Sequence, residues 1–394
     1  MVLRYTRRMA RRVPLILTAA IAAVPWLVLS LPTDDPADVP TLPDVPYKYA
    51  DSDVDLPPHF RAFSANPGSY DNIDNTPRNN PTTNAGATLG RVLFYDKRLS
   101  ASDTVACGSC HLQKHGFSDP RPLSVGFDGK ETKRHSLPLV NVRYYENGRM
   151  FWDERAPTLE KQVLMPIQSA IEMGMTLDGL VAKLSSAEFY GPLFKDAFGT
   201  EKVTSDRIAR AIAQFVRSLV SYESKFDRAL AAPSTGDVLT EQEQRGHKLF
   251  TGTPRPGSLE RFIRTGPELG LATCANCHIT EIQTGDGLRN NGLDPDLSLD
   301  PGTNGFFKAP SLRNVAVRTA FMHDGRFSTL REVVEHYSTG IKAHPRLILL
   351  RGRGGRPLRP DLSDEDIEAL VAFMLTLTDE KFLTDPKFSN PFAK

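Results

Sequence analysis

Large net charge, spare cysteines and strand-like patterning are all missing from this sequence of 394 residues. Its 48 basic and 47 acidic residues give a net charge of +1, so no global charge points to nucleic acid or an anionic membrane surface as a partner. No run of useful length alternates apolar and polar residues, so we expect few strands. All four cysteines stand in two C-x-x-C-H motifs, which leaves none for a disulfide or a thiol nucleophile.

The two C-x-x-C-H motifs are typical of covalent c-type haem attachment. In this chemistry two cysteine sulfurs bond to the haem vinyl groups and the histidine that follows ligates the iron. A four-cysteine zinc site is the alternative, but the two pairs lie far apart and each carries its own histidine. The sequence therefore predicts two haem c groups, attached through Cys107, Cys110, Cys274 and Cys277 and ligated by His111 and His278.

The first residues carry an export pattern. Five arginines and no acid fall within residues 1–12, and an apolar run follows up to residue 31. This predicts a signal peptide or membrane anchor over residues 1–31, which agrees with haem c attachment outside the cytoplasm and indicates a periplasmic location. Residues 32–58 are rich in proline and aspartate, so we expect a linker that buries no core.

The rest of the chain predicts a mainly α, loop-rich fold of two cytochrome c-like haem domains, residues 59–232 and 237–394. Each half has a Leu-Phe pair ahead of its haem motif, Leu93-Phe94 and Leu249-Phe250, which indicates an internal duplication. Apolar spacing and N-cap residues predict helices over Thr82–Phe94, Pro157–Met165, Thr176–Leu184 and Ser205–Tyr222, and further helices that begin near Thr240, Ser328 and Ser363.

From about Thr82 to Leu377 the sequence resembles the bacterial di-haem cytochrome c peroxidases and their MauG-type relatives. The matching motifs are Leu93-Phe-Tyr-Asp-Lys-Arg-Leu-Ser100, Phe151-Trp-Asp-Glu-Arg-Ala156, Pro166-Ile-Gln, Glu172-Met-Gly174, Pro310-Ser-Leu-Arg-Asn314, Met322-His-Asp-Gly325 and the two haem motifs. The resemblance implies that the N-terminal haem reacts with hydrogen peroxide. It also implies that a redox partner protein supplies electrons.

The family's peroxide pocket implies roles for three residues counted from the Trp-Asp motif: Gln162, Pro166 and Glu172. A carboxylate beside an open iron can move the proton that peroxide cleavage requires, and an amide can hold the peroxide. Without the resemblance, a solvated charge at a helix end would be the simpler interpretation of Glu172. Trp152 resembles the tryptophan that the family places between the two haems, although core packing alone would also explain it.

Two positions depart from the peroxidases. The distal histidine that closes the resting peroxide haem in many of them falls at Phe127, which cannot bind iron, so we expect an open first haem. The methionine that ligates their second haem falls at Tyr337, as in MauG-type enzymes, and the spacing from Leu330 places Tyr337 on an apolar stripe. Met322 is a rival ligand, and His323 of the His-Asp-Gly motif is expected at the same haem.

The relatives bind calcium between the haems through an asparagine whose position is His135 here, so a calcium ion is doubtful. Three hypotheses on function follow. The leading one is a MauG-like peroxidase that oxidises a partner protein or other substrate through a high-valent haem. The second is an ordinary cytochrome c peroxidase fed by a small cytochrome or cupredoxin. The third is a di-haem electron carrier, which two closed haems would require.

Overall fold

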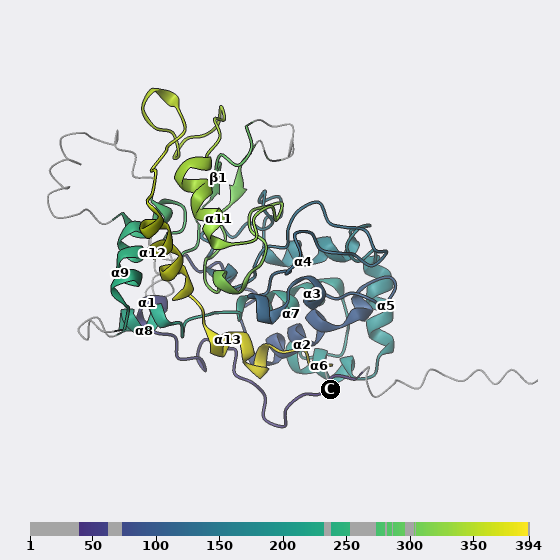
Figure 1. The fold of residues 1–394 in the computed structure, drawn as a ribbon. Helices are drawn as coiled ribbons and strands as arrows, with labels where there is room; N and C mark the ends of the chain where they lie inside the picture. The colour runs from purple at the N-terminus through teal and green to yellow at the C-terminus, as the bar shows by residue number, and fades with distance from the viewer. Residues whose placement is uncertain are drawn as a thin grey trace, which may run out of the picture.

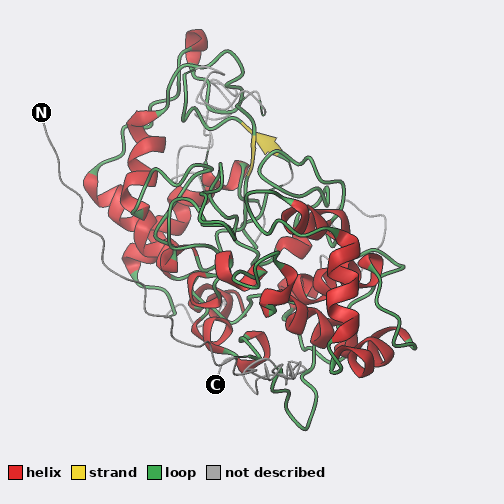
Figure 2. Ribbon diagram, turned by 90° about the vertical axis from the view of Figure 1, so that its right-hand side faces the viewer, coloured by secondary structure: helices red, strands yellow, loops and turns green. Residues whose placement is uncertain are grey.

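The computed structural model describes residues 39–61, 73–231, 238–252, 273–279, 282–285, 287–295, 303 and 305–392. Helices form two groups with long loops between them (Figures 1 and 2). Their bounds are α1 Pro58–Arg61, α2 Asn84–Tyr95, α3 Cys107–Cys110, α4 Leu159–Gln168, α5 Leu177–Ser186, α6 Tyr190–Phe198, α7 Ser205–Arg217, α8 Lys225–Ala231, α9 Glu241–Thr251, α11 Leu330–Glu335, α12 Asp364–Leu375 and α13 Glu380–Thr384. The mainly α, loop-rich fold class is confirmed.

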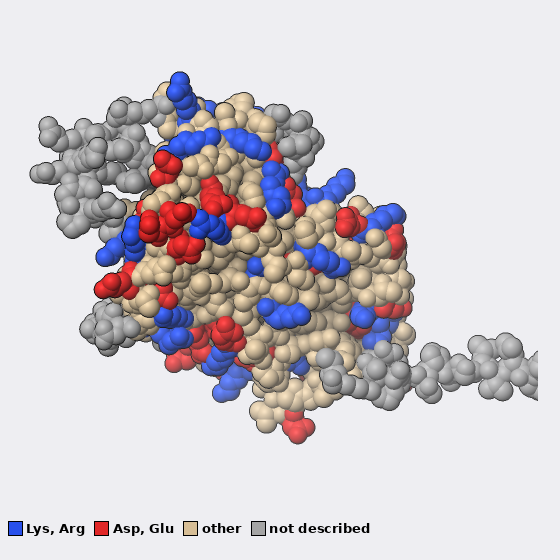
Figure 3. Space-filling model, viewed as in Figure 1, with Lys and Arg blue, Asp and Glu red and all other residues tan. Residues whose placement is uncertain are grey.

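Strands are almost absent from the described residues. β1 (Leu288–Arg289) pairs antiparallel with β2 (Phe307–Lys308), with Leu288 opposite Lys308. None of the helices in these ranges is long and apolar enough to cross a bilayer. The face in Figure 3 carries basic and acidic side chains intermixed, in keeping with the near-zero net charge. The predicted leader over residues 1–31 lies outside the described residues.

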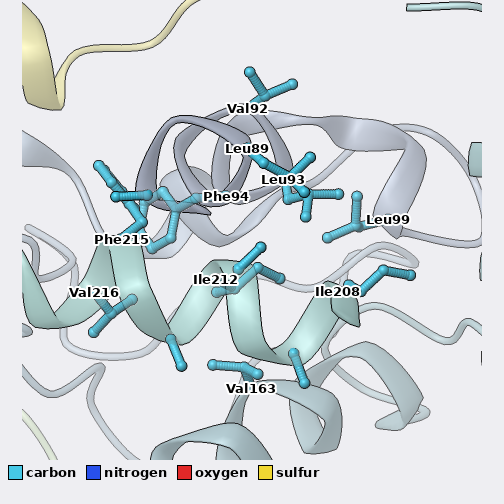
Figure 4. Packing of buried hydrophobic residues seen from close by; sticks show 14 of the residues in the cluster. Leu89, Val92, Leu93, Phe94, Leu99, Val163, Ile208, Ile212, Phe215 and Val216 are labelled. Atoms are coloured by element: carbon cyan, nitrogen blue, oxygen red, sulfur yellow. The ribbon is translucent and has the colours of Figure 1, made fainter. Parts of the chain in front are cut away.

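The N-terminal helices pack around a close contact between α2 and α7. Leu89, Leu93 and Phe94 of α2 face Ile208, Ile212 and Phe215 of α7, and Val163 of α4 lies on the other side of α7 (Figure 4). A Cβ atom at Gly90 would lie 1.9 Å from the carbonyl oxygen of Ala211, so only glycine lets the two backbones approach this closely.

The C-terminal helices repeat the same contact. A Cβ atom at Gly246 of α9 would lie 1.9 Å from the carbonyl oxygen of Ala369 in α12. Four residues after each member of this pair come Phe250 and Phe373, whose ring centroids are 5.1 Å apart. The matching N-terminal pair, Phe94 and Phe215, is 5.2 Å apart. The two halves therefore share one helix-packing unit, which supports the duplication inferred from the Leu-Phe pairs.

Most predicted helices are present, with small shifts at their ends. Threonine side chains at 83, 158, 176, 204, 240 and 329 and Ser363 accept a hydrogen bond from the first turn of α2, α4, α5, α7, α9, α11 and α12. The helix expected over Ser205–Tyr222 ends at Arg217 instead. Beyond it, the backbone N–H groups of Tyr222 and Glu223 donate to Asp379 Oδ2 at 3.0 and 2.9 Å, a pairing that a continuing helix would forbid. Helices α6, α8 and α13 were not predicted.

The described part of the expected linker is not a free spacer. Tyr49 is 3% exposed and Leu56 8%, and the Tyr49 hydroxyl donates to the carbonyl oxygen of Lys387 at 2.5 Å. We expected this segment to bury no core, and that was wrong for residues 39–58, because its few apolar side chains are enough to anchor it along the body.

The packing also crosses the predicted domain boundary, part of which, residues 232–236, lies outside the described residues. Phe226 of α8 belongs to the C-terminal cluster, although the sequence assigned it to the first domain. Conversely, α13 crosses back to the N-terminal helices (Figure 1), where Phe382 and Phe388 enter their core. Each half therefore contributes an end segment to the hydrophobic core of the other half. This packing holds the two haem motifs in fixed positions relative to each other.

Candidate active site

The residues predicted for the first haem line one cavity of about 680 Å³. This volume is within the usual range of small-molecule and cofactor pockets, about 300–1,000 Å³. Its walls include all seven of the residues expected at this site: Cys107, Cys110, His111, Trp152, Gln162, Pro166 and Glu172. The structure thus brings together residues that the sequence separates by up to 65 positions, 107 to 172.

Both haem-motif histidines are oriented by a backbone carbonyl. His111 Nδ1 lies 3.0 Å from the carbonyl oxygen of Phe117, and His278 Nδ1 lies 3.0 Å from that of Pro310. A histidine that donates Nδ1–H in this way presents a neutral Nε2 to a metal. Burial lowers the pKa of both rings, that of His278 to about 4, which favours the neutral form required of an iron ligand.

The opposite wall of the cavity carries the predicted peroxide residues. Gln162 and Pro166 are one helical turn apart on α4, so they lie on the same face. Glu172 follows the end of this helix, where Ser169 hydrogen-bonds its carboxylate and the charge of Arg155 acts on it. Burial raises the pKa of Glu172 above its ordinary value, which suits a group that must both accept and return a proton.

Phe127 lies beside Glu172 but outside the cavity wall. Its backbone N–H donates to the carbonyl oxygen of Glu172 at 3.0 Å, and its ring covers Gly174. The residues nearest to Phe127 in sequence that line the cavity are Ser124 and Thr132. The position where many peroxidases carry a distal histidine therefore holds a side chain that packs away from the site.

Trp152 links the cavity to the C-terminal half. Its indole Nε1–H donates to the carbonyl oxygen of His135 at 2.7 Å, and its ring meets Phe307 and His323 edge to face at 6.4 and 6.5 Å. The backbone N–H of Lys308 donates to the Trp152 carbonyl at 2.8 Å. Trp152 is 7% exposed, so it is packed between the halves on every side.

Pro310 joins the two haem sites directly. Its carbonyl oxygen orients His278, while the same residue lines the cavity that contains His111. Sequence reasoning recognised the Pro310-Ser-Leu-Arg-Asn314 motif but gave it no role. The carbonyl that this proline presents could not be assigned from residue type, since any residue has one.

The second site gathers Tyr337, Asn291 and Met322. Asn291 hydrogen-bonds the Tyr337 hydroxyl and also lies 3.5 Å from Met322 Sδ through its Nδ2. Cys274 and Cys277 act on the pKa of Tyr337, so the phenol is near the second haem motif. Burial raises this pKa above its ordinary value, so the phenol loses its proton only with a cation at its oxygen. His336 Nε2 instead lies 3.0 Å from the carbonyl oxygen of Asn291.

His323 lies between the two sites, against Phe307 and next to Trp152. Its ring stacks on Phe307 with centroids 3.8 Å apart and 12° between planes, and its carbonyl oxygen accepts from the His135 N–H at 2.8 Å. His323 is 5% exposed. The predicted haem-contact residue is thus also a packing partner of the inter-site tryptophan.

Known proteins share both the sequence and the fold. Residues 84–235 match the di-haem cytochrome c peroxidase family, and residues 263–378 match the cytochrome c family. The chain is 35% identical to the methylamine utilization protein MauG of Methylorubrum extorquens over 77% of its own length and 81% of that protein. It is 30% identical to a cytochrome c551 peroxidase of Nitrosomonas europaea over 77% and 82%. The chain belongs to the di-haem cytochrome c peroxidase and MauG family.

A solved structure agrees with this assignment. A MauG-like protein associated with microbial copper homeostasis superposes with a TM-score of 0.66 at 31% identity, over 80% of this chain and 96% of that one. As a member of the family, the chain is a di-haem peroxidase, an oxidoreductase that acts on peroxide and exchanges electrons with a redox partner protein. Two haem c groups are its cofactors.

The described residues fit these haems, and Arg318 gives an independent indication. Arg318 is 7% exposed, its Nε has no hydrogen-bond partner, and no carboxylate of the described chain pairs with it. Burial alone lowers its pKa to about 10. Its charge acts on both His278 and His135, so the guanidinium lies near the second haem motif. A haem carries two propionates, and a carboxylate of this kind is the partner that a buried guanidinium requires.

Proposed function

We propose that this protein is a MauG-like di-haem peroxidase. His111 and His278 would each hold a haem, the first haem would supply the site for peroxide, and Trp152 would share the oxidising equivalents between the two haems. They are then spent on an external donor, a partner protein. The observation that carries the proposal is that Glu172 and Gln162 line the His111 cavity while Phe127 packs outside it. An electron carrier has no use for a half-buried acid in the wall of a haem cavity.

Glu172, Gln162 and Pro166 have different roles toward a bound peroxide in this proposal. As the O–O bond breaks, one oxygen must lose its proton and the other must gain one. Glu172 is placed to take and return that proton, because its pKa is raised by burial and Ser169 orients its carboxylate. Gln162 is placed to hold the peroxide by its amide, and Pro166 fills the space beside it without offering a competing donor.

Tyr337 is the proposed ligand that sets the reduction potential of the second haem. A phenolate is a hard anionic ligand, and it stabilises oxidised iron better than a thioether does. The hydrogen bond from Asn291 would hold the phenolate oxygen in place. A second haem of low potential is a poor acceptor for an ordinary donor cytochrome, and a good store for an oxidising equivalent. This favours the MauG-like hypothesis over the ordinary peroxidase.

We also propose a periplasmic location, from the arginine-rich start and apolar run over residues 1–31, with retention as an anchor or removal as a signal both open. His135 stands at the position of the asparagine that binds calcium in the relatives, and its Nδ1 lies 3.1 and 3.0 Å from the carbonyl oxygens of Arg121 and Pro122. Calcium prefers oxygen ligands, so we propose that this imidazole does not hold a calcium ion. Burial lowers the pKa of His135, and the positive charge of the nearby Arg318 lowers it further.

Peroxide added to the full-length, as-isolated diferric protein tests the proposal. We expect the haem spectrum to change within seconds to a persistent high-valent species with no prior reduction. Glu172→Gln should slow this step by roughly 10²- to 10⁴-fold with unchanged resting spectra, and Glu188→Gln, at an exposed position, should leave it unchanged. Reaction only after one-electron reduction would establish an ordinary cytochrome c peroxidase. Two six-coordinate haems that ignore peroxide would leave only the carrier.

A further inference from the structure

The turn that contains Trp152 also contains Glu154, whose carboxylate contacts different residues from those that the indole contacts. Met150 and Ala156 close this turn as an isolated β-bridge, and two non-glycine residues within it have positive φ, Phe151 at 70° and Glu154 at 54°. Such conformations cost on the order of 1–3 kcal/mol each and persist where the surroundings fix them. Here the surroundings of Glu154 include a buried phenol.

Tyr145 is that phenol, and it lines the cavity of the first haem. It is 0% exposed, and its hydroxyl donates to Glu154 Oε1. Glu154 is 8% exposed and also accepts from Asn147 Nδ2 at 2.8 Å. Asn147 is exposed, and Arg149, 48% exposed, lies 4.0 Å from the other carboxylate oxygen. The carboxylate of Glu154 thus connects a phenol in the haem cavity with the solvent-facing turn at residues 146–149.

A hydrogen-bonded tyrosine and carboxylate can do chemistry that neither can do alone. Removal of an electron from a phenol makes its O–H strongly acidic, so oxidation is easy only where a base takes the proton at once. Glu154 is such a base, and it already accepts the hydrogen bond along which the proton would move. Trp152, the only tryptophan beyond residue 31, is 7% exposed and meets the ring of His323 edge to face, so its own side chain does not reach the surface.

We propose that Tyr145 and Glu154 form a proton-coupled redox relay between the first haem and the external donor. In the forward step Tyr145 would give one electron to the peroxide-oxidised first haem, its phenolic O–H bond would break, and the proton would move to Glu154 Oε1. A neutral tyrosyl radical then faces a protonated carboxyl group. In the return step the donor gives one electron to the radical, and Glu154 gives back the proton. The relay rests on the proposed peroxide chemistry for its oxidant.

Electron paramagnetic resonance of the full-length holoprotein after peroxide addition tests the relay, with optical spectra of the haems recorded in parallel. Tyr145→Phe should reduce a tyrosyl radical signal at least tenfold while peroxide still oxidises the haem. Tyr144→Phe is the matched control, because Tyr144 is also buried but packs against Phe60 at 5.5 Å and does not line the cavity. Its radical signal should equal that of the unaltered protein.

Glu154→Gln separates a proton acceptor from a structural partner. Glutamine keeps an oxygen that can accept from the Tyr145 hydroxyl, but it cannot hold the proton, so the radical yield should again fall at least tenfold. An undiminished radical in Tyr145→Phe or in Glu154→Gln would overturn the relay while the peroxide chemistry stands, and so would an oxidised haem with no tyrosyl radical in the unaltered protein. Failure of the unaltered haem to oxidise would instead overturn the proposed function.

Discussion

The indole N–H of Trp152 donates to the backbone carbonyl oxygen of His135 at 2.7 Å, and the same His135 donates its backbone N–H to His323 at 2.8 Å. His135 therefore fixes the edge of the tryptophan to the segment that follows the second haem motif. This carbonyl holds the polar edge of the indole, and the ring also meets Phe307 and His323 edge to face.

Trp152→Phe should separate the two haems functionally. The variant loses the hydrogen bond to His135 and leaves a buried carbonyl unpaired, which costs about 1–3 kcal/mol of unfolding free energy. Both resting haem spectra should persist, because no iron ligand changes. After peroxide addition, optical spectra should show oxidation confined to the His111 haem. Oxidation of both haems at the unaltered rate would show that the tryptophan only packs.

Tyr337→Phe tests the ligand of the second haem. Removal of the hydroxyl should change the spectrum of the His278 haem in the resting protein and raise its reduction potential, because an anionic ligand no longer stabilises ferric iron. Met322→Leu is the matched comparison, since Met322 Sδ also lies near Asn291. A spectrum altered by Met322→Leu and untouched by Tyr337→Phe would assign the ligand to the thioether.

Much of this architecture was predictable from sequence because it depends on local rules. The haem motifs, the helix N-caps and the apolar stripe of α7 are encoded within a few residues of each other. The family motifs likewise located Trp152, Gln162 and Glu172. The end of α7 was not predictable, because its stop depends on Asp379, which is 162 residues beyond Arg217 in the chain.

Residues whose role depends on a partner far away in the chain could not be identified from the sequence. Arg318 looks like any surface arginine in the sequence, but the fold buries it, and no carboxylate within the described ranges pairs with it. Tyr145 and Glu154 are nine positions apart, a spacing typical of no regular element, and only the strained turn at Glu154 brings them together. The segment over residues 39–58 was misjudged for a related reason, since its composition gives no sign of the hydrophobic cluster that Tyr49 joins.

Arg318→Met should lower the reduction potential of the His278 haem. A buried cation disfavours ferric iron, so its loss stabilises the oxidised state. Unit charges roughly 10 Å apart at an effective dielectric of about 20 interact by about 1–2 kcal/mol, which sets the size of the effect. Spectroelectrochemical titration of the holoprotein measures it, with Arg351→Met as an exposed control. Equal potentials in the two variants would argue that Arg318 has no electrostatic contact with the haem.

Gly246→Ala tests the helix contact that the two halves share. The added methyl would lie 1.9 Å from the carbonyl oxygen of Ala369, so α9 and α12 must move apart at a cost of about 1–3 kcal/mol. Gly191→Ala in α6 is the matched control, because its Cβ would meet nothing closer than 3.5 Å and alanine favours a helix by up to about 1 kcal/mol over glycine. Urea denaturation of the holoprotein should therefore shift in opposite directions for the two variants.

Lys308 should make the oxidation of Tyr145 depend on pH. Its ammonium lies 3.6 Å from the centroid of the Tyr145 ring, where a positive charge opposes removal of an electron. Burial lowers the pKa of Lys308 to about 7, and the carboxylate of Glu154 opposes that shift. Among the described residues, its nitrogen also lies 3.1 Å from the carbonyl oxygen of Arg149 and 3.7 Å from Met150 Sδ.

The sign of this dependence follows from the lowered pKa. Below pH 7 Lys308 is mostly cationic and Tyr145 is hard to oxidise; above it the amine is neutral and the ring gives up an electron more readily. The tyrosyl radical yield after peroxide addition should therefore rise between pH 6 and pH 8. Lys308→Met, which has no charge at either pH, should give the high yield at both, so a yield that still rises with pH in this variant would assign the dependence to another group.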